Sequence, residues 1–196
     1  MLTRQTPAKI NLGLHVLRRR SDGYHDIESV LLPISWCDTI TVRRSETFTM
    51  TCTDPSLPTD ESNLCLQAAH LLAEEAGFSA GAQIHLEKHI PHGAGLGGGS
   101  SDAAATLRLL AELWELSYEA DRLRAIAGKI GSDVPFFLEG RPMVVRGRGT
   151  EMEPLDEAYE FPFHLVVAKP PVSMSTARAY DLVTPRADAR PDLREL

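Results

Sequence analysis

The sequence has few of the features that mark a secreted, membrane-spanning or nucleic-acid-binding protein. Its three cysteines form an odd set without CxxC spacing, which argues against a disulfide framework and favours a reducing compartment. No apolar run approaches the roughly 20 residues that span a bilayer. The net charge of −7 provides no basic excess for nucleic acid or a membrane surface. We therefore expect a cytoplasmic protein with neither of those partners, and the oligomeric state stays open.

The chain is long enough for one large domain, or for one domain and part of another. Its 196 residues are 43% apolar, which is enough for a core. A soft domain boundary falls at the acidic, proline-containing stretch 151–162. Alternating apolar residues or β-rich composition predict strands. The predicted strands cover residues 9–17, 27–34, 38–44, 82–88, 142–149 and 161–170.

Helical spacing alternates with these strands. In 63–77, Leu64, Ala68, Leu71 and Leu72 share one face, and Gly77 marks the C-terminal end. Similar spacing, or helix-forming composition, predicts helices over 101–116, 119–131 and 175–183. The segment 51–63 is loop-like, and GSDVPFFL is a turn that leads into a short apolar piece.

The stretch PHGAGLGGGSS lies between a predicted strand and a predicted helix. Backbone N–H groups and the positive end of the helix dipole bind anions at such a junction, and glycine lets the backbone approach a phosphate closely. A glycine-rich turn that only packs a helix on a sheet is the alternative. The pattern lacks the Gly-Lys-Ser/Thr ending of a Walker A loop, and no suitably placed acidic residue makes it a dinucleotide fingerprint.

The same stretch resembles the central ATP-binding signature of the GHMP kinases, the superfamily of galactokinase, homoserine kinase and mevalonate kinase. Three further stretches, PAKINLGLHV, DGYHDIESV and GSDVPFF, are similar to members that phosphorylate a cytidine-diphosphate-linked methylerythritol in non-mevalonate isoprenoid biosynthesis. The resemblance runs from about residue 7 to about residue 182. It implies ATP and Mg²⁺, with Mg²⁺ near Ser100. The ATP-binding loop that it implies consists of Pro91, His92, Gly93, Ala94, Gly95, Leu96, Gly97, Gly98, Gly99, Ser100 and Ser101.

The resemblance also implies a catalytic pair, Lys9 and Asp133. Phosphoryl transfer to an alcohol needs a group that takes the hydroxyl proton, and an aspartate beside a lysine can supply it. Taken alone, Lys9 would be a solvated charge and Asp133 a turn residue or helix cap. Asn11 shares a strand face with Lys9 and is expected to orient the substrate hydroxyl.

Aromatic residues are implied on the substrate side. Tyr24, His25 and Tyr180 match positions that bind the cytidine, with the two tyrosines on either side of the base. On the nucleotide side, Asn63 and Leu64 match the segment that meets the adenine, although Asn63 is equally suited to cap a helix. Lys88 either assists the nucleotide or is a solvated lysine at a strand end. We expect Asp102 to turn away from the phosphates, and we expect ordinary surface or loop residues at His85, His89 and His92.

The fold that the resemblance implies is α+β. Residues 1–152 form the N-terminal ATP-binding domain with a left-handed βαβ unit, and 153–196 begin a second, substrate-binding domain. The late glycine-rich motif of the superfamily has no match, so this second domain is expected to be incomplete. Two alternatives stay open, namely a GHMP kinase of the homoserine or mevalonate type and a non-catalytic nucleotide-binding fragment.

Overall fold

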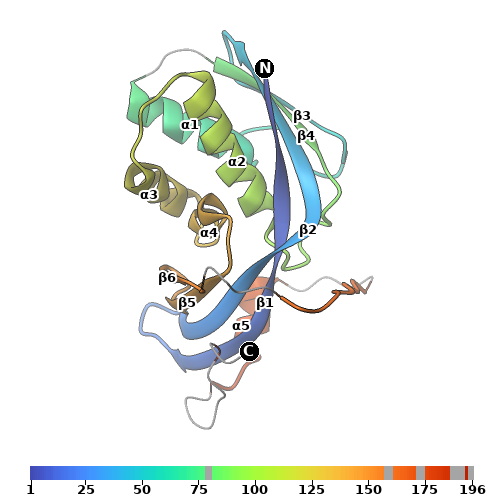
Figure 1. The fold of residues 1–196 in the computed structure, drawn as a ribbon, viewed down its shortest axis with the longest axis vertical. Helices are drawn as coiled ribbons and strands as arrows, with labels where there is room; N and C mark the ends of the chain where they lie inside the picture. The colour runs from blue at the N-terminus through green and yellow to red at the C-terminus, as the bar shows by residue number, and fades with distance from the viewer. Residues whose placement is uncertain (78–80, 157–160, 171–174, 186–192, 194–196) are drawn as a thin grey trace.

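A six-stranded β-sheet is the central element of the fold. The computed structural model describes residues 1–77, 81–156, 161–170, 175–185 and 193. Figure 1 shows two long strands, β1 and β2, that run the length of the molecule and carry shorter strands at their two ends. The strands are β1 (Leu2–Arg19), β2 (His25–Ser45), β3 (Thr49–Cys52), β4 (Gly81–Glu87), β5 (Met143–Gly147) and β6 (Glu151–Pro154).

β2 is the centre of the sheet. β1 pairs with it antiparallel along one edge, with register shifts that include one between Leu12 and Leu14. On the other edge, Thr39–Ser45 pairs with β4 and Ile27–Leu31 pairs with β5. The sequence predicted two strands over 27–44, but one strand spans both. β1 pairs with β2 on both sides of Ser35 and Trp36, which lie at a register shift, so one strand continues through them.

The helices α1 (Leu64–Ala76), α2 (Gly98–Leu113), α3 (Ala120–Ile130) and α4 (Val134–Glu139) lie together on one side of the long strands (Figure 1). Helix α2 contacts both long strands as well as α1, α3 and α4. The main core joins α1 and α2 to the upper half of the sheet and includes Leu72, Ile84 and Leu110, which are fully buried. These contacts hold α2 in place, and with it the end of the glycine loop that precedes it.

The fold is α+β, as the sequence predicted. β3 and β4 pair in parallel with α1 between them, so they form a βαβ unit, whose handedness stays a prediction. The helices predicted over 63–77, 101–116, 119–131 and 175–183 are present, the last as α5 (Thr176–Asp181). The apolar piece of GSDVPFFL is the short helix α4.

One predicted strand is absent. Residues 161–170 alternate like a strand, but they are extended coil that pairs with no other described strand. An apolar pattern becomes a strand only where its backbone forms hydrogen bonds with a neighbouring strand, and this segment contacts the middle of the sheet through side chains such as Val167 without pairing with it. The boundary predicted at 152 remains a prediction, and β6 pairs with β5 across that position.

No helix in the described part of the chain is both long and apolar enough to cross a membrane.

Candidate active site

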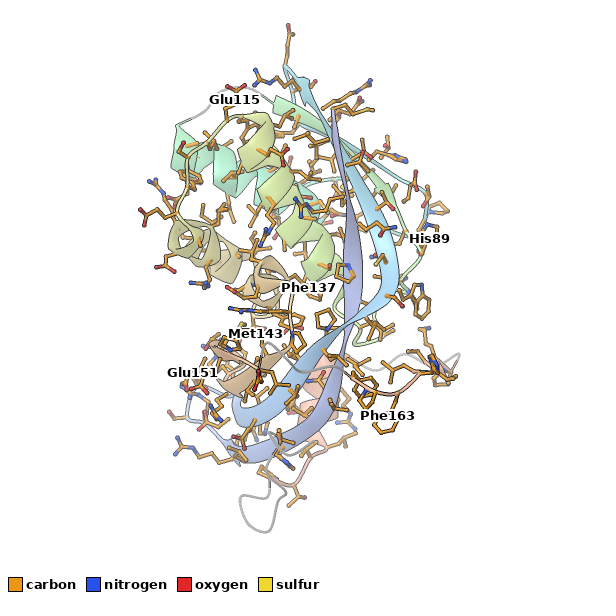
Figure 2. All side chains as sticks on the ribbon, in the orientation of Figure 1. His89, Glu115, Phe137, Met143, Glu151 and Phe163 are labelled. Atoms are coloured by element: carbon orange, nitrogen blue, oxygen red, sulfur yellow. The ribbon has the colours of Figure 1, made fainter. Side chains whose placement is uncertain are left out.

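The glycine loop, residues 91–97, is packed between β1 and α4. The Lys9 backbone N–H donates to the Leu96 carbonyl over 2.8 Å, which fixes the loop to β1. Gly97 precedes α2 in a left-handed conformation with φ +71°, and a Cβ there would lie 2.8 Å from Phe137 Cζ and 3.0 Å from Lys9 Cγ. Phe137 is labelled in Figure 2 beside the long strands. Position 97 therefore requires glycine on both conformational and steric grounds.

Helix α2 begins directly after this loop, at Gly98. The first N–H groups of a helix have no intrahelical partner, and the helix dipole makes that end positive. The Ser101 hydroxyl is buried and has no hydrogen-bond partner among the described residues. The loop and the helix start thus form a site suited to an anion such as a phosphate.

Lys9 and Asp133 meet beside this loop. Lys9 Nζ lies 4.0 Å from Asp133 Oδ2. The Lys9 side chain is only 10% exposed, and burial lowers its pKa although the charge of Asp133 opposes that shift. Asp133 occupies the N-cap position of α4 but makes no side-chain capping bond, and its side chain is 40% exposed. A carboxylate that faces both a lysine and solvent is accessible to a substrate.

Asn11 holds Lys9 in place. Lys9 Nζ donates to Asn11 Oδ1 over 2.8 Å, and Asn11 Nδ2 donates to Ser29 Oγ over 2.8 Å. Ser29 in turn donates to the Gly13 carbonyl over 2.6 Å. The shared strand face that the sequence predicted for Lys9 and Asn11 is present. Ser29 was not predicted, because nothing in its local sequence separates it from any other strand serine.

Two of the predicted aromatic residues, His25 and Tyr180, contact each other near Asp133. The rings of His25 and Tyr180 are stacked, with centroids 5.3 Å apart and planes 20° apart. Burial, and then the charge of Asp133, raises the pKa of Tyr180, so the phenol lies within electrostatic reach of Asp133. Tyr180 and His25 therefore converge on the predicted site although they are far apart in sequence.

Tyr24 contacts an arginine side chain. Its ring is exposed, and the guanidinium of Arg148 lies over it, with Cζ 3.8 Å from the ring centroid. Stacking on Tyr180 is made by His25, and the placement of the two tyrosines on either side of one base stays a prediction. Arg148 was not predicted, because the tip of the β5–β6 turn is brought to Tyr24 by tertiary contacts alone.

On the nucleotide side, Asn63 is the N-cap of α1, and its side chain accepts the Cys65 N–H over 3.0 Å. The capping alternative for Asn63 is thus confirmed, and its nucleotide role stays a prediction. Leu64 Cδ1 lies 3.7 Å from a Cβ placed on Gly99, so the start of α1 lies beside the start of α2.

Lys88 is not the solvated lysine that the sequence allowed. Its side chain is 4% exposed, and its ammonium donates to Asp38 Oδ2 over 2.5 Å and to Asp102 Oδ2 over 2.7 Å. Asp102 turns its carboxylate inward, to Lys88 and to the Thr6 hydroxyl. A nucleotide contact by Lys88 stays a prediction that would require the ammonium to leave these partners.

The described residues hold no group of three histidine, cysteine or acidic side chains placed to bind a metal. His85 bonds to Thr51, and His89 and His92 are exposed, in keeping with ordinary surface or loop histidines.

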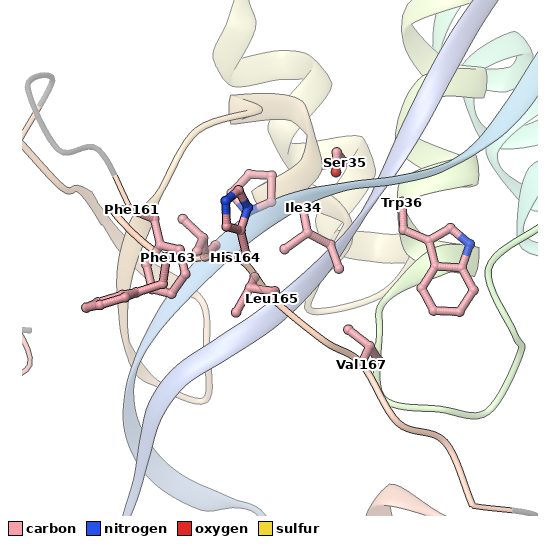
Figure 3. A pocket seen from close by; sticks show the side chains of 10 residues that line it. Ile34, Ser35, Trp36, Phe161, Phe163, His164, Leu165 and Val167 are labelled. Carbon is pink, nitrogen blue, oxygen red and sulfur yellow. The ribbon is translucent and has the colours of Figure 1, made fainter.

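A cavity of about 450 Å³ lies between the middle of β2 and the segment 161–167 (Figure 3). Ile34 and Trp36 line it on one side, and Phe161 and Phe163 on the other. Its described lining includes His164 but no carboxylate, lysine or arginine, so it lacks the lysine–carboxylate pair that Lys9 and Asp133 form.

Comparison with known proteins agrees with this geometry. The model of the GHMP kinases N-terminal domain matches residues 63–141. A 4-diphosphocytidyl-2-C-methyl-D-erythritol kinase of Salinibacter ruber is 57% identical, over all of this chain and 70% of its own length. One from Chlorobium limicola is 49% identical, over 96% of this chain and 66% of its own length. The chain thus spans about two thirds of these relatives.

Solved structures give the same result. The crystal structure of a 4-(cytidine 5'-diphospho)-2C-methyl-D-erythritol kinase superposes with a TM-score of 0.69 at 44% identity, over 79% of this chain and 55% of that one. A mevalonate kinase superposes with a TM-score of 0.58 at 14% identity, over 80% of this chain and 57% of its own, which shows the shared fold alone. The chain belongs to the 4-diphosphocytidyl-2-C-methyl-D-erythritol kinase family of GHMP kinases.

Proposed function

We propose that the protein transfers the γ-phosphoryl group of ATP to the 2-hydroxyl of 4-diphosphocytidyl-2-C-methyl-D-erythritol, a step of non-mevalonate isoprenoid biosynthesis in the cytoplasm. The observation that carries this proposal is the Lys9–Asp133 pair beside the glycine loop. The family names supply the substrate.

Asp133 accepts the proton of the substrate hydroxyl in this mechanism. The hydroxyl oxygen forms a bond to the γ-phosphorus, the bond from phosphorus to the β–γ bridging oxygen breaks, and ADP leaves with that oxygen. Lys9 lies 4.0 Å away and places a positive charge beside the carboxylate that accepts the proton. Asn11 orients Lys9, and its amide nitrogen carries a second hydrogen that can reach a substrate oxygen.

The glycine loop and the start of α2 bind the phosphates of ATP. The backbone N–H groups there already point toward the position of the anion. Because they need no reorganisation when the anion binds, they stabilise its negative charge effectively. The buried Ser101 hydroxyl lacks a partner among the described residues, so it fits a phosphate oxygen or a metal-bound group, and Ser100 lies beside it in the same turn. Mg²⁺, held with the ATP phosphates near these serines, would neutralise charge on the transferred group.

The stacked His25 and Tyr180 bind the cytosine. Tyr180 lies within electrostatic reach of Asp133, as a substrate that is held at its base and reacts at its alcohol requires. Arg148 lies over the ring of Tyr24, the neighbour of His25, and its positive charge suits the diphosphate of the substrate.

Initial rates with three alcohols test the proposal. The protein is given MgATP with 4-diphosphocytidyl-2-C-methyl-D-erythritol, mevalonate or homoserine, and ADP formation is followed. We expect turnover with the cytidine-bearing alcohol alone. Turnover with one of the other alcohols would indicate a different GHMP kinase. ATP binding without turnover of any would indicate a non-catalytic nucleotide-binding protein.

A further inference from the structure

A buried charge cluster, formed by Asp38, Lys88 and Asp102, lies beneath the glycine loop. Lys88 Nζ bridges the two carboxylates at 2.5 Å and 2.7 Å, and the three side chains are between 0% and 4% exposed. Lys88 follows β4, Asp38 belongs to β2, and Asp102 lies in the first turns of α2. The cluster thus joins two strands of the sheet to the helix that begins at the phosphate site.

Each carboxylate of the cluster also holds a second group. Asp38 Oδ1 accepts the backbone N–H groups of His89, over 2.5 Å, and Ile90, over 2.7 Å, which lead into the loop. Asp102 Oδ1 accepts the Thr6 hydroxyl over 2.7 Å from β1, three residues before Lys9. The entry of the loop, its exit into α2 and the strand of Lys9 are therefore tied to one ammonium group.

Close packing places this ammonium directly against the loop. A Cβ on Gly98 would lie 3.0 Å from Lys88 Nζ and 3.1 Å from Ile90 Cγ2, so a side chain on the first residue of α2 would require these neighbours to shift. A shift of Lys88 would therefore be transmitted to the N–H groups of the first helical turn.

The cluster carries two carboxylates against one ammonium, an arrangement that stability alone does not favour in a protein interior. Burial, with repulsion from Asp38 and against the pull of Lys88, raises the pKa of Asp102 to about 6. The other titratable groups near Asp102 are Cys52 of β3 and Cys65 of α1. Burial raises the pKa of both thiols, which keeps them neutral.

We propose that Asp38, Lys88 and Asp102 are positioning residues for the glycine loop. They fix the separation between its entry and its exit, and so hold its backbone N–H groups in the geometry that binds the nucleotide phosphates. The nature of the ligand rests on the proposed function, whereas the positioning of the loop does not.

Hydrogen exchange and nucleotide binding together test this proposal on residues 1–196. The variants are Lys88→Met, which removes the ammonium, and the milder Thr6→Val, which removes only the hydroxyl donated to Asp102. Thr6→Ser keeps that hydroxyl. Lys129→Met is the matched control, since Lys129 forms a 2.5 Å ion pair with Glu75 far along the helical layer and is 54% exposed. Amide exchange is followed over residues 89–101, and ATP binding is followed by calorimetry.

We expect amide exchange over 89–101 to rise about 10-fold in Thr6→Val, and more in Lys88→Met. Each lost hydrogen bond weakens the connection between the charge cluster and the glycine loop. The ATP Kd should rise about 5-fold or more in the same variants, while Thr6→Ser and Lys129→Met match the parent protein. If Lys88→Met does not fold, Thr6→Val and Thr6→Ser decide the matter.

The proposal is overturned if exchange over 89–101 in folded Thr6→Val equals that of Lys129→Met, or if exchange rises while the ATP Kd stays unchanged. Should the parent protein not bind ATP at all, the proposed function fails, and the exchange measurement alone still decides whether the cluster positions the loop.

Discussion

Substituting Gly97 by alanine should disturb the site more than the same change at Gly95, by an amount that follows from the structure. Both glycines have a positive φ, +71° and +74°, so each substitution costs roughly 1–2 kcal/mol for the left-handed backbone. At Gly95 a new Cβ meets nothing within 4 Å. At Gly97 it lies 2.8 Å from Phe137 Cζ and 3.0 Å from Lys9 Cγ, well inside the ordinary contact distance of about 3.5–4.0 Å.

This overlap cannot be relieved cheaply, because Phe137 belongs to the main core and Lys9 is held by Asn11. Overpacking of this kind typically costs about 1–3 kcal/mol in addition to the backbone term. Gly97→Ala should therefore have a Tm roughly 2–12 °C below that of Gly95→Ala, by the usual scaling for a chain of this size. Displacement of Lys9 should also lower kcat more in Gly97→Ala.

Thermal unfolding followed by circular dichroism, with initial rates on the same samples, measures both effects. Equal Tm values and equal kcat values for the two variants would refute the packing of loop, lysine and phenylalanine described above.

Three further substitutions test other parts of the site. Asp133→Asn should lower kcat by about 10²- to 10⁴-fold and leave the ATP Kd nearly unchanged, because only the proton acceptor is lost; an unchanged kcat would remove Asp133 from the mechanism. Tyr180→Ala should raise the KM for the cytidine substrate by roughly 5- to 150-fold through lost stacking, while Tyr180→Phe stays close to the parent value and the KM for ATP hardly moves. The raised pKa of Asp102 means that its contribution to folding stability is full below about pH 4 and is lost as the pH rises through about 6. Compared with Asp102→Asn in urea unfolding, the parent protein should therefore lose up to roughly 3 kcal/mol between pH 4 and pH 7; a constant difference would contradict the raised pKa.

The sequence predicted those parts of the molecule that depend on local pattern. Apolar spacing and helix-forming composition located α1, α2, α3 and α5, and strand alternation located β1, β4 and β5. The same alternation failed at residues 161–170, which contact the sheet through side chains without pairing with a described strand. It also divided β2, which continues as one strand through a register shift in its pairing with β1.

The residues of the site likewise differ in how far the sequence predicted them. The pairing of Lys9 with Asp133 was expected from the family resemblance, and taken alone Lys9 would have been a solvated charge and Asp133 a turn residue or helix cap. Lys88 was misjudged because its two partners, Asp38 and Asp102, lie 50 and 14 residues away in sequence, a separation that no local pattern encodes. Arg148 was missed for the same reason, since only the tertiary fold places it over Tyr24.

The most direct measurement is a proton-coupled ³¹P NMR spectrum of the reaction of MgATP with 4-diphosphocytidyl-2-C-methyl-D-erythritol. The 2-hydroxyl is on a tertiary carbon, so a phosphate placed there has no proton three bonds away. We predict a new monoester resonance that is a singlet, the persistence of the substrate diphosphate signals, and the absence of the new resonance with Asp133→Asn. A multiplet at the new resonance, inorganic phosphate as the only product, or no transfer at all would contradict the proposed reaction.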